Sequence, residues 1–277
     1  PGAHVTLAIN ADYVDHAISE AISDWKRAHE AAGGTVMIVE SSHAKLHHAH
    51  TTRPQRHFVS RAVGLVPWRS WRRSDNDGVG ASIIDGINEY NSRGSGALRP
   101  HVSELADYQD PDALFLTCGD SRILPNVITA SGPGDLFTIR NVGNVVPTDP
   151  ADGSVDASLD FAINQLNVSS VVVCGHSSCG AMKALLSEST DTPTTPVGRW
   201  LDYARDSLIA FQEHHPARAS AEAHGFNEVD QLGVVNVAIQ VERLIHHPIL
   251  AGAVVSGRVR VVGTFFNIAE AHGYEVD

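Results

Sequence analysis

The sequence is poor in cysteine and lacks long apolar runs, and both features narrow the class of protein. Three cysteines in 277 residues are too few for a disulfide framework and favour a reducing compartment, with thiols kept for a metal or for catalysis. No stretch reaches the ~18 apolar residues of a membrane-spanning helix, and no secretory signal is visible. The first residue is Pro rather than Met, so we expect a piece of a longer protein, located in the cytoplasm or on the cytoplasmic side of a membrane.

Positive charge is also scarce. The net charge of -12 argues against nucleic acid as a partner, and the hydrophobic content of 43% predicts a packed core. Histidine and arginine concentrate in residues 43–75, which Pro54 and Pro67 interrupt, and we interpret this segment as a linker. Two alternatives are metal binding by its histidines and binding of its arginines and tryptophans to an acidic membrane surface.

Strand and helix patterns alternate from about residue 76 to the end of the chain. This alternation predicts an α/β fold with a mainly parallel sheet flanked by helices. Residues 1–42 add a strand, a helix and a strand, which are too few to form a stable domain alone. We therefore divide the chain into segments 1–42, 43–75 and 76–277. In the last segment the predicted strands are 113–118, 135–141, 169–175 and 258–268, and the predicted helices are 79–92, 154–167, a helix starting at 179, and 229–245.

Residues with chemical potential come directly after two of the predicted strands. Cys118 ends one strand, and Asp120 and Arg122 follow it. His176 and Cys179 lie just past the end of another strand. Functional groups collect at the carboxyl ends of strands in a parallel α/β sheet, so we expect Cys118, His176 and Cys179 to converge. Two thiolates and one imidazole suit zinc, and three protein ligands leave a fourth position open, as in catalytic zinc sites.

Asp120 and Arg122, which follow Cys118, fit the same chemistry. Zinc lowers the pKa of a bound water, and a nearby carboxylate such as Asp120 can orient that water towards an electrophile. Arg122 can hold Asp120 in place through a bidentate pair. Alternatively, the two residues form a salt bridge that only stabilises a turn. Cys174 lies inside an apolar strand, where a small buried thiol is ordinary, and we interpret it as structural.

Two motifs together resemble the zinc signature of the β-class carbonic anhydrases. They are CGDSR at 118–122 and HSSCG at 176–180, and the resemblance extends to GDLFTIRNVGNVVP at 134–147 and VVNVAIQVERL at 234–244. The resemblance implies one zinc ion per chain and a lyase that interconverts carbon dioxide with bicarbonate and a proton. It covers residues 76–277.

The resemblance also implies substrate-binding roles at matching positions. Gln109 matches a glutamine that hydrogen-bonds bicarbonate, and the Gly180 amide would face the substrate. Phe137 and Val142 match apolar walls around carbon dioxide. The alternative is ordinary: a polar loop residue at 109 and core residues at the two apolar positions.

The same resemblance implies an obligate homodimer, often a tetramer, in which each active site is completed across the interface. The helix at 79–92 would be the arm that packs on the partner. Residues 1–42 resemble the C-terminal half of a STAS domain of the kind that follows SulP anion transporters. This resemblance implies that the full-length protein carries a membrane transporter domain. The alternative is a simple helical extension.

Two other functions stay open at this point. A carbon disulfide or carbonyl sulfide hydrolase would use the same zinc site, and a non-catalytic bicarbonate sensor could serve the transporter. The Asp120–Arg122 pair argues against the sensor, because a sensor has no need to orient a nucleophile. A cysteine phosphatase is excluded by spacing, since only three residues separate Cys118 from Arg122.

Overall fold

The computed structural model describes residues 3–9, 16–40, 81–149, 151–187 and 195–276. The chain divides into two units, Pro1–Val59 and Ser60–Asp277, and each is treated by itself. The predicted His- and Arg-rich linker at 43–75 lies outside the described residues, so the domain boundaries that we place at its ends stay predictions.

The described residues of the first unit form a β–α–β element. Strands β1 (His4–Ile9) and β2 (Thr35–Glu40) pair in parallel, and helix α1 (His16–Ala31) connects them. Gly33, at φ +83°, lies just after the end of α1, in the left-handed conformation that glycine adopts without steric cost. Apolar side chains of this unit are exposed in the described structure: Trp25, Met37 and Val39 are 41%, 60% and 48% exposed.

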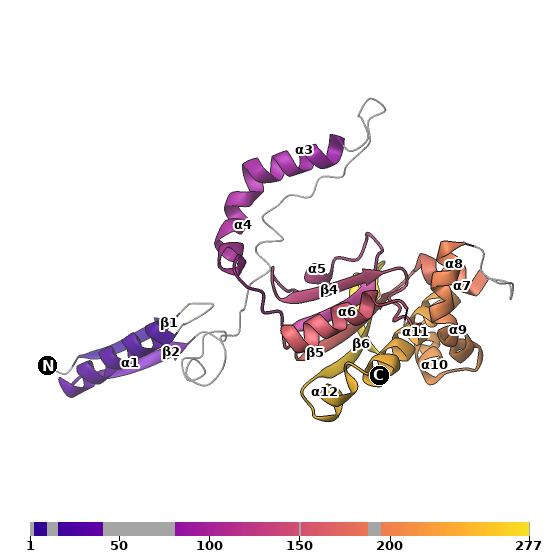
Figure 1. The fold of residues 1–277 in the computed structure, drawn as a ribbon. Coiled ribbons are helices and arrows are strands. Elements are labelled where there is room, and N and C mark those ends of the chain that lie inside the picture. Colours follow the sequence, from indigo (N-terminus) through magenta and orange to yellow (C-terminus); the bar gives the residue numbers. More distant parts are fainter. Residues whose placement is uncertain (1–2, 10–15, 41–80, 150, 188–194, 277) are drawn as a thin grey trace. The chain divides into compact units, whose positions relative to one another are not determined.

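The second unit contains a five-stranded sheet in the order β4-β3-β5-β6-β7 (Figure 1). The first four strands are parallel and β7 is antiparallel to β6. The prediction of a mainly parallel sheet flanked by helices is therefore confirmed. The strands are β3 (Ala113–Cys118), β4 (Leu136–Asn141), β5 (Ser170–His176), β6 (Arg260–Asn267) and β7 (His272–Val276).

One expectation about the sheet was wrong. We predicted the strand at 258–268 to be the last, but the chain turns at Ala271, which has φ +50°, and returns as β7. This strand is short and polar at most positions (HGYEV), so it lacks the apolar run that marks the buried strands. Every residue of β3, which lies between β4 and β5, is buried, as expected for a parallel strand covered on both faces.

The helices of the second unit include several that we did not predict, among them α8, α9, α10 and α12. The helical segment predicted at 79–92 is described from Ala81 and continues through two irregular turns to Leu105. The helices are α3 (Ala81–Glu89), α4 (Ser95–Val102), α5 (Pro125–Ile128), α6 (Ser154–Asp160), α7 (Gly180–Ser187), α8 (Pro196–Leu201), α9 (Arg205–Gln212), α10 (Pro216–Ala223), α11 (Glu228–Ile245) and α12 (Ala251–Val255).

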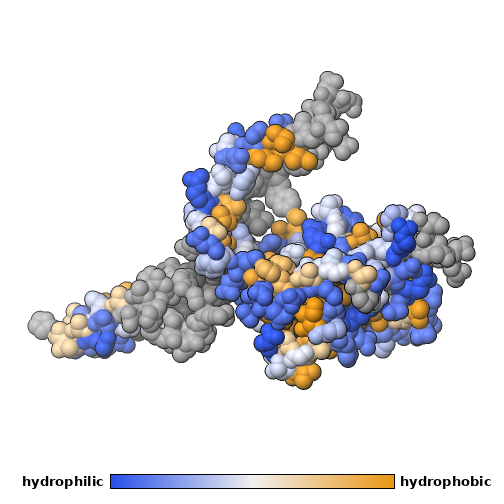
Figure 2. Space-filling view, in the orientation of Figure 1, coloured by the Kyte–Doolittle hydropathy of each residue, from blue (hydrophilic) through white to orange (hydrophobic). Residues whose placement is uncertain are grey.

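Helix α3 carries an apolar row on its surface. Ile83, Ile84 and Ile87 are 51%, 58% and 50% exposed, and Figure 2 shows the apolar surface over this helix. Ordinary protein surfaces expose single, scattered apolar residues, whereas this helix exposes three isoleucines together. Within the described ranges, no helix is both long and apolar enough to cross a membrane.

Helix α11 packs on β5 and β6 at unusually close range. A Cβ atom on Gly175 of β5 would lie 2.7 Å from Val237 Cγ2, and one on Gly263 of β6 would lie 2.8 Å from Val237 Cγ1. Both glycines therefore permit an approach that any larger residue would block. This approach places α11 close to the loops that follow the central strands.

Candidate metal centre

Three buried side chains meet at the carboxyl ends of β3 and β5. Cys118 is the last residue of β3, His176 is the last residue of β5, and Cys179 directly precedes α7. One ligand atom from each lies within 4.8 Å of the others. Since β3 and β5 are parallel neighbours, the sheet itself brings these side chains together. They are the three residues that we predicted as metal ligands.

The orientation of His176 fits a metal. Its Nδ1 lies 2.9 Å from the carbonyl oxygen of Ser177, which fixes Nδ1 as the protonated nitrogen and leaves a lone pair on Nε2. That Nε2 is buried and has no hydrogen-bond partner among the described residues. A buried ring nitrogen without a partner is costly, and a metal ion would satisfy it. This carbonyl contact is the support that metal-binding histidines ordinarily have.

The two cysteines of the centre differ in their pKa. Hydrogen bonding to the Cys179 thiol, together with interactions with His176 and the Gly143 amide, lowers the pKa of Cys118 to about 4 despite its burial. The hydrogen bond to Cys118 and burial raise the pKa of Cys179. The pair therefore shares one proton while no cation is present, and binding of a metal ion would displace it.

Asp120 lies at the rim of the centre and is held by Arg122. The guanidinium donates from Nε to Oδ1 at 2.9 Å and from Nη2 to Oδ2 at 2.7 Å, and the Arg122 backbone amide donates to Oδ1 at 2.9 Å. These hydrogen bonds hold the pKa of the Asp120 carboxyl far below its usual range. Asp120 Oδ2 lies 3.8 Å from Nε2 of His176, so an ionised carboxylate faces the place where a metal would sit.

The loop that carries Cys179 is held from two sides. Ser178 has φ +55°, a conformation that is uncommon for a residue other than glycine. Its amide donates to Oδ1 of Asp230 at 2.6 Å, and its carbonyl accepts from Arg122 Nη2 at 3.1 Å. Asp230 belongs to α11 and is buried. Our sequence reasoning missed it, because a carboxylate in the first turn of a helix is typical and carries no functional signal.

The loop after β4 supplies a hydrogen bond to Cys118. The amide of Gly143 donates to Cys118 Sγ at 3.4 Å. Gly143 has φ +81°, and a Cβ there would lie 3.0 Å from that of Ala181. Trp200 donates to the Val142 carbonyl at 2.7 Å and Asn236 donates to the Gly143 carbonyl at 3.0 Å. Asn236 and Trp200 were missed too, although a buried asparagine within the apolar stretch of α11 was a visible irregularity.

The predicted substrate-binding residues lie outside the group of candidate metal ligands. Phe137 of β4 is partly buried and its ring centroid lies 5.8 Å from that of Phe161. Val142 is 46% exposed, and Gly180 is the exposed first residue of α7. Gln109 is exposed in the loop before β3. None of these four belongs to the group of side chains described above that could hold a metal.

Cys174 stands apart from the centre. It is 2% exposed inside β5, and burial raises its pKa. A buried thiol with a raised pKa is a poor metal ligand and a poor nucleophile. This setting agrees with the structural role that we gave it.

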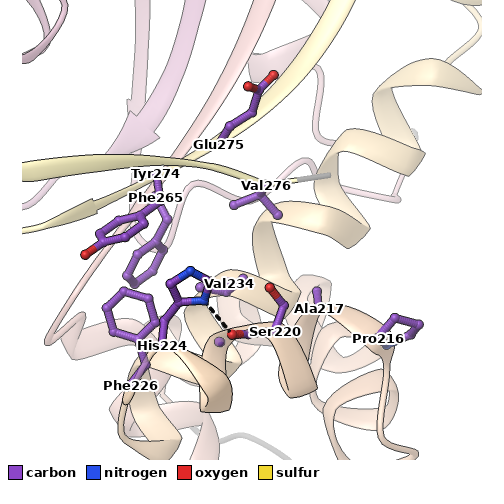
Figure 3. A pocket seen from close by; sticks show the side chains of 11 residues that line it. Pro216, Ala217, Ser220, His224, Phe226, Val234, Phe265, Tyr274, Glu275 and Val276 are labelled. Carbon is purple, nitrogen blue, oxygen red and sulfur yellow. Dashed lines mark hydrogen bonds between the residues drawn. The ribbon is translucent and has the colours of Figure 1, made fainter.

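A cavity of about 300 Å³ lies between α10, the first half of α11 and the edge strand β7. Figure 3 shows the rings of His224, Phe226 and Tyr274 grouped on one side of it, with His224 Nδ1 donating to the Ser220 carbonyl. Its lining includes none of the predicted site residues. The cavity is therefore separate from the candidate centre.

Comparison with known proteins places the second unit in a family. Residues 113–272 match the family model described as carbonic anhydrase. The chain is 37% identical to a carbonic anhydrase of Pseudomonas aeruginosa over 187 residues, which are 67% of this chain and 82% of that protein. It is 36% identical to a carbonic anhydrase of Synechococcus elongatus over 188 residues, 67% of each chain.

Solved structures agree with the sequence relatives. The β-carbonic anhydrase CcaA superposes with a TM-score of 0.64 at 29% identity, over 72% of this chain and 96% of that one. A tetrameric β-carbonic anhydrase of Sordaria macrospora superposes with a TM-score of 0.60 at 26% identity, over 72% and 98% of the two chains.

Proposed function

The chain belongs to the β class of the carbonic anhydrase family, whose members are lyases, and on this premise we propose that it holds one zinc ion and reversibly hydrates carbon dioxide to bicarbonate and a proton. The observation that carries the proposal is the convergence of two thiols and an unpartnered imidazole nitrogen within 4.8 Å. Cys118, His176 and Cys179 would be the protein ligands, and this donor set suits zinc.

Zinc held there would lower the pKa of a water molecule towards neutrality and so supply a nucleophile at physiological pH. The chain's own contribution is orientation. Asp120 faces the centre with its carboxylate ionised and can accept a hydrogen bond from that water. Such a bond would orient the nucleophile towards the substrate carbon.

Arg122 is a positioning residue in this scheme. Its two side-chain hydrogen bonds and its backbone amide occupy both oxygens of Asp120. They keep the carboxylate ionised and hold it beside the three ligands rather than among them. Arg122 also holds the Ser178 carbonyl, so one side chain aligns the acid and the Cys179 loop together.

Carbon dioxide would enter against apolar side chains. It has no dipole, so it needs an unhydrated surface rather than a polar pocket. We assign that surface to Phe137 and Val142, and we assign the Gly180 amide to a substrate oxygen. Gln109 is exposed on this chain, and its proposed contact with bicarbonate would be made in the assembled oligomer.

We propose a homodimer as the smallest active assembly. The exposed isoleucines of α3 support this, because burying them against a second copy would remove an apolar row from water. The solved relative from Sordaria macrospora is described as tetrameric.

We further propose that residues 1–42 are part of a STAS domain and that the chain is the cytoplasmic tail of a SulP-type anion transporter. The parallel β–α–β element with exposed Met37 and Val39 supports an incomplete domain that other strands would cover. A transporter that moves bicarbonate would gain from an enzyme that interconverts it with carbon dioxide.

The first experiment measures zinc content and carbon dioxide hydration on one purified sample between about pH 6.5 and 9. We expect one zinc per chain and a rate that rises with pH. Cys118→Ser is the matched variant and should lose zinc, because a hydroxyl replaces a thiolate that donates strongly to zinc. A Cys118→Ser protein with full zinc would refute the ligand assignment.

Zinc without hydration at any pH would move the proposal to a carbon disulfide or carbonyl sulfide hydrolase, or to a bicarbonate-sensing module. Carbon disulfide is the next substrate to test in that case. Turnover would identify the hydrolase, and bicarbonate binding without turnover would identify the sensor.

A further inference from the structure

One peptide group beside the centre is held at both of its ends. The carbonyl of Val142 accepts a hydrogen bond from Trp200 Nε1 at 2.7 Å, and the amide of Gly143 donates to Cys118 Sγ at 3.4 Å. The Val142 carbonyl and the Gly143 amide belong to the same peptide unit. A peptide unit is planar, so holding the carbonyl direction also holds the direction of the N–H group.

The backbone at this point would otherwise have freedom to turn. Gly143 lies at φ +81°, and glycine occupies several backbone conformations at similar cost. Asn236 holds the next peptide unit through the Gly143 carbonyl, which leaves the preceding unit to Trp200. Trp200 belongs to α8, which is distant in sequence from both β3 and β4.

We propose that Trp200 is a positioning residue, whose indole N–H aims the Gly143 amide at the sulfur of Cys118. The inference rests on the proposed function in one respect, namely that Cys118 ligates the metal. A hydrogen bond to a thiolate reduces the charge that the sulfur donates, and such outer contacts tune a bound metal. Donation to the Val142 carbonyl also polarises the peptide unit and strengthens its N–H as a donor.

A packing role for Trp200 predicts something different. Its ring lies edge-on to Tyr203 with centroids 5.6 Å apart, so the side chain also packs against the turn Asp202–Ala204. Trp200→Phe keeps an aromatic ring at this position and removes the N–H donor. If Trp200 served only in packing, Trp200→Phe would leave the electronic state of the Cys118 sulfur unchanged.

The test loads the whole chain with cobalt(II) in place of zinc and records the thiolate-to-cobalt charge-transfer band. Loss of the hydrogen bond raises the energy of the sulfur electrons, so the band of Trp200→Phe should move to longer wavelength. Trp25→Phe makes the same chemical change in the first unit and should leave the band where it is. In the zinc-loaded protein, Trp200→Phe should lower kcat/KM about tenfold, the lower end for loss of an outer contact.

A Trp200→Phe band that coincides with the native band would overturn the inference. If this variant fails to fold, the other three tryptophans are replaced by phenylalanine and Trp200 by an analogue that carries sulfur in place of the indole N–H. That protein keeps the shape of the ring and must show the same shift. A native chain that shows no thiolate-to-cobalt band at all would instead refute the proposed metal site.

Discussion

The two units of the chain share a parallel β–α–β arrangement but differ in how far their strands are buried. Each contains a pair of parallel strands joined by a helix: α1 joins β1 to β2, and α5 joins β3 to β4. In the second unit, strands β3 and β5 are covered by packed neighbours, and their carboxyl ends meet at a cluster of buried ligands. In the described part of the first unit, two strands pair only with each other, and Met37 and Val39 are exposed.

The difference shows what a sheet needs before it can support chemistry. A thiolate, an imidazole and a carboxylate can be held at fixed distances only where neighbouring strands and helices remove their freedom. The described residues of the first unit form one helix and two strands and supply no such frame by themselves. Matched substitutions in the two units test this contrast.

The largest effect should follow removal of the oriented carboxylate. Asp120→Ala should lower the hydration rate by about 10²- to 10⁴-fold, the range for loss of a positioned acid–base group. Zinc content should stay unchanged, because Asp120 is outside the three-ligand group. Stopped-flow hydration and metal analysis on the same sample check both points.

The control for this variant lies in the first unit. Asp24→Ala breaks another Asp–Arg pair, with Arg27, and should leave the rate unaltered. An equal loss in both variants would mean that the effect does not come from the centre.

The next effect concerns burial. Leu116 lies in the middle of β3 and is 1% exposed, so Leu116→Ala should lower the free energy of unfolding by about 2–5 kcal/mol. Met37→Ala removes a side chain that is 60% exposed, so it should change the free energy of unfolding by less than about 0.5 kcal/mol. Urea denaturation at one protein concentration measures both. A large loss of unfolding free energy in Met37→Ala would show that other residues bury this side chain.

A smaller effect should come from the close contact of α11 with the sheet. Gly175→Ala places a methyl group 2.7 Å from Val237 Cγ2 and should cost about 1–3 kcal/mol of unfolding free energy through overpacking. Gly252→Ala, in α12, meets nothing within 4 Å and should stabilise by about 0.5–1 kcal/mol. A Gly175→Ala variant that is as stable as the native chain would show that α11 does not approach the sheet as described.

The smallest effect is the ionisation of one thiol, that of Cys118. In the metal-free chain, the pKa of Cys118 is lowered to about 4 by Cys179 and its other neighbours, so one thiolate should persist at neutral pH and disappear as the pH falls through about 4. Cys174 and Cys179 should stay protonated at neutral pH, since both have raised pKa values. Ultraviolet thiolate absorbance of the native chain against Cys118→Ser measures this. Absorbance that appears only near pH 8.5, where a free thiol ionises, would contradict it.

Much of this protein was readable from the sequence. Continuous apolar runs predicted β3 and β5, and the residues at their ends predicted the ligand group, because parallel strands present their carboxyl ends at one edge of a sheet. The five-residue strand β7 was not readable, since its polar composition resembles a loop and its place depends on pairing with β6.

The sequence by itself determined the alternation of strands and helices and the choice of two thiols, one imidazole and one carboxylate beside an arginine as the candidate reactive groups. The tertiary structure alone decided which side chains hold them. Trp200, Asn236 and Asp230 reach the loops beside Cys118 and Cys179 from elements far away in the chain. Local patterns record burial and turn preference, whereas hydrogen bonds between distant elements exist only once glycine-lined packing has brought a helix against the sheet.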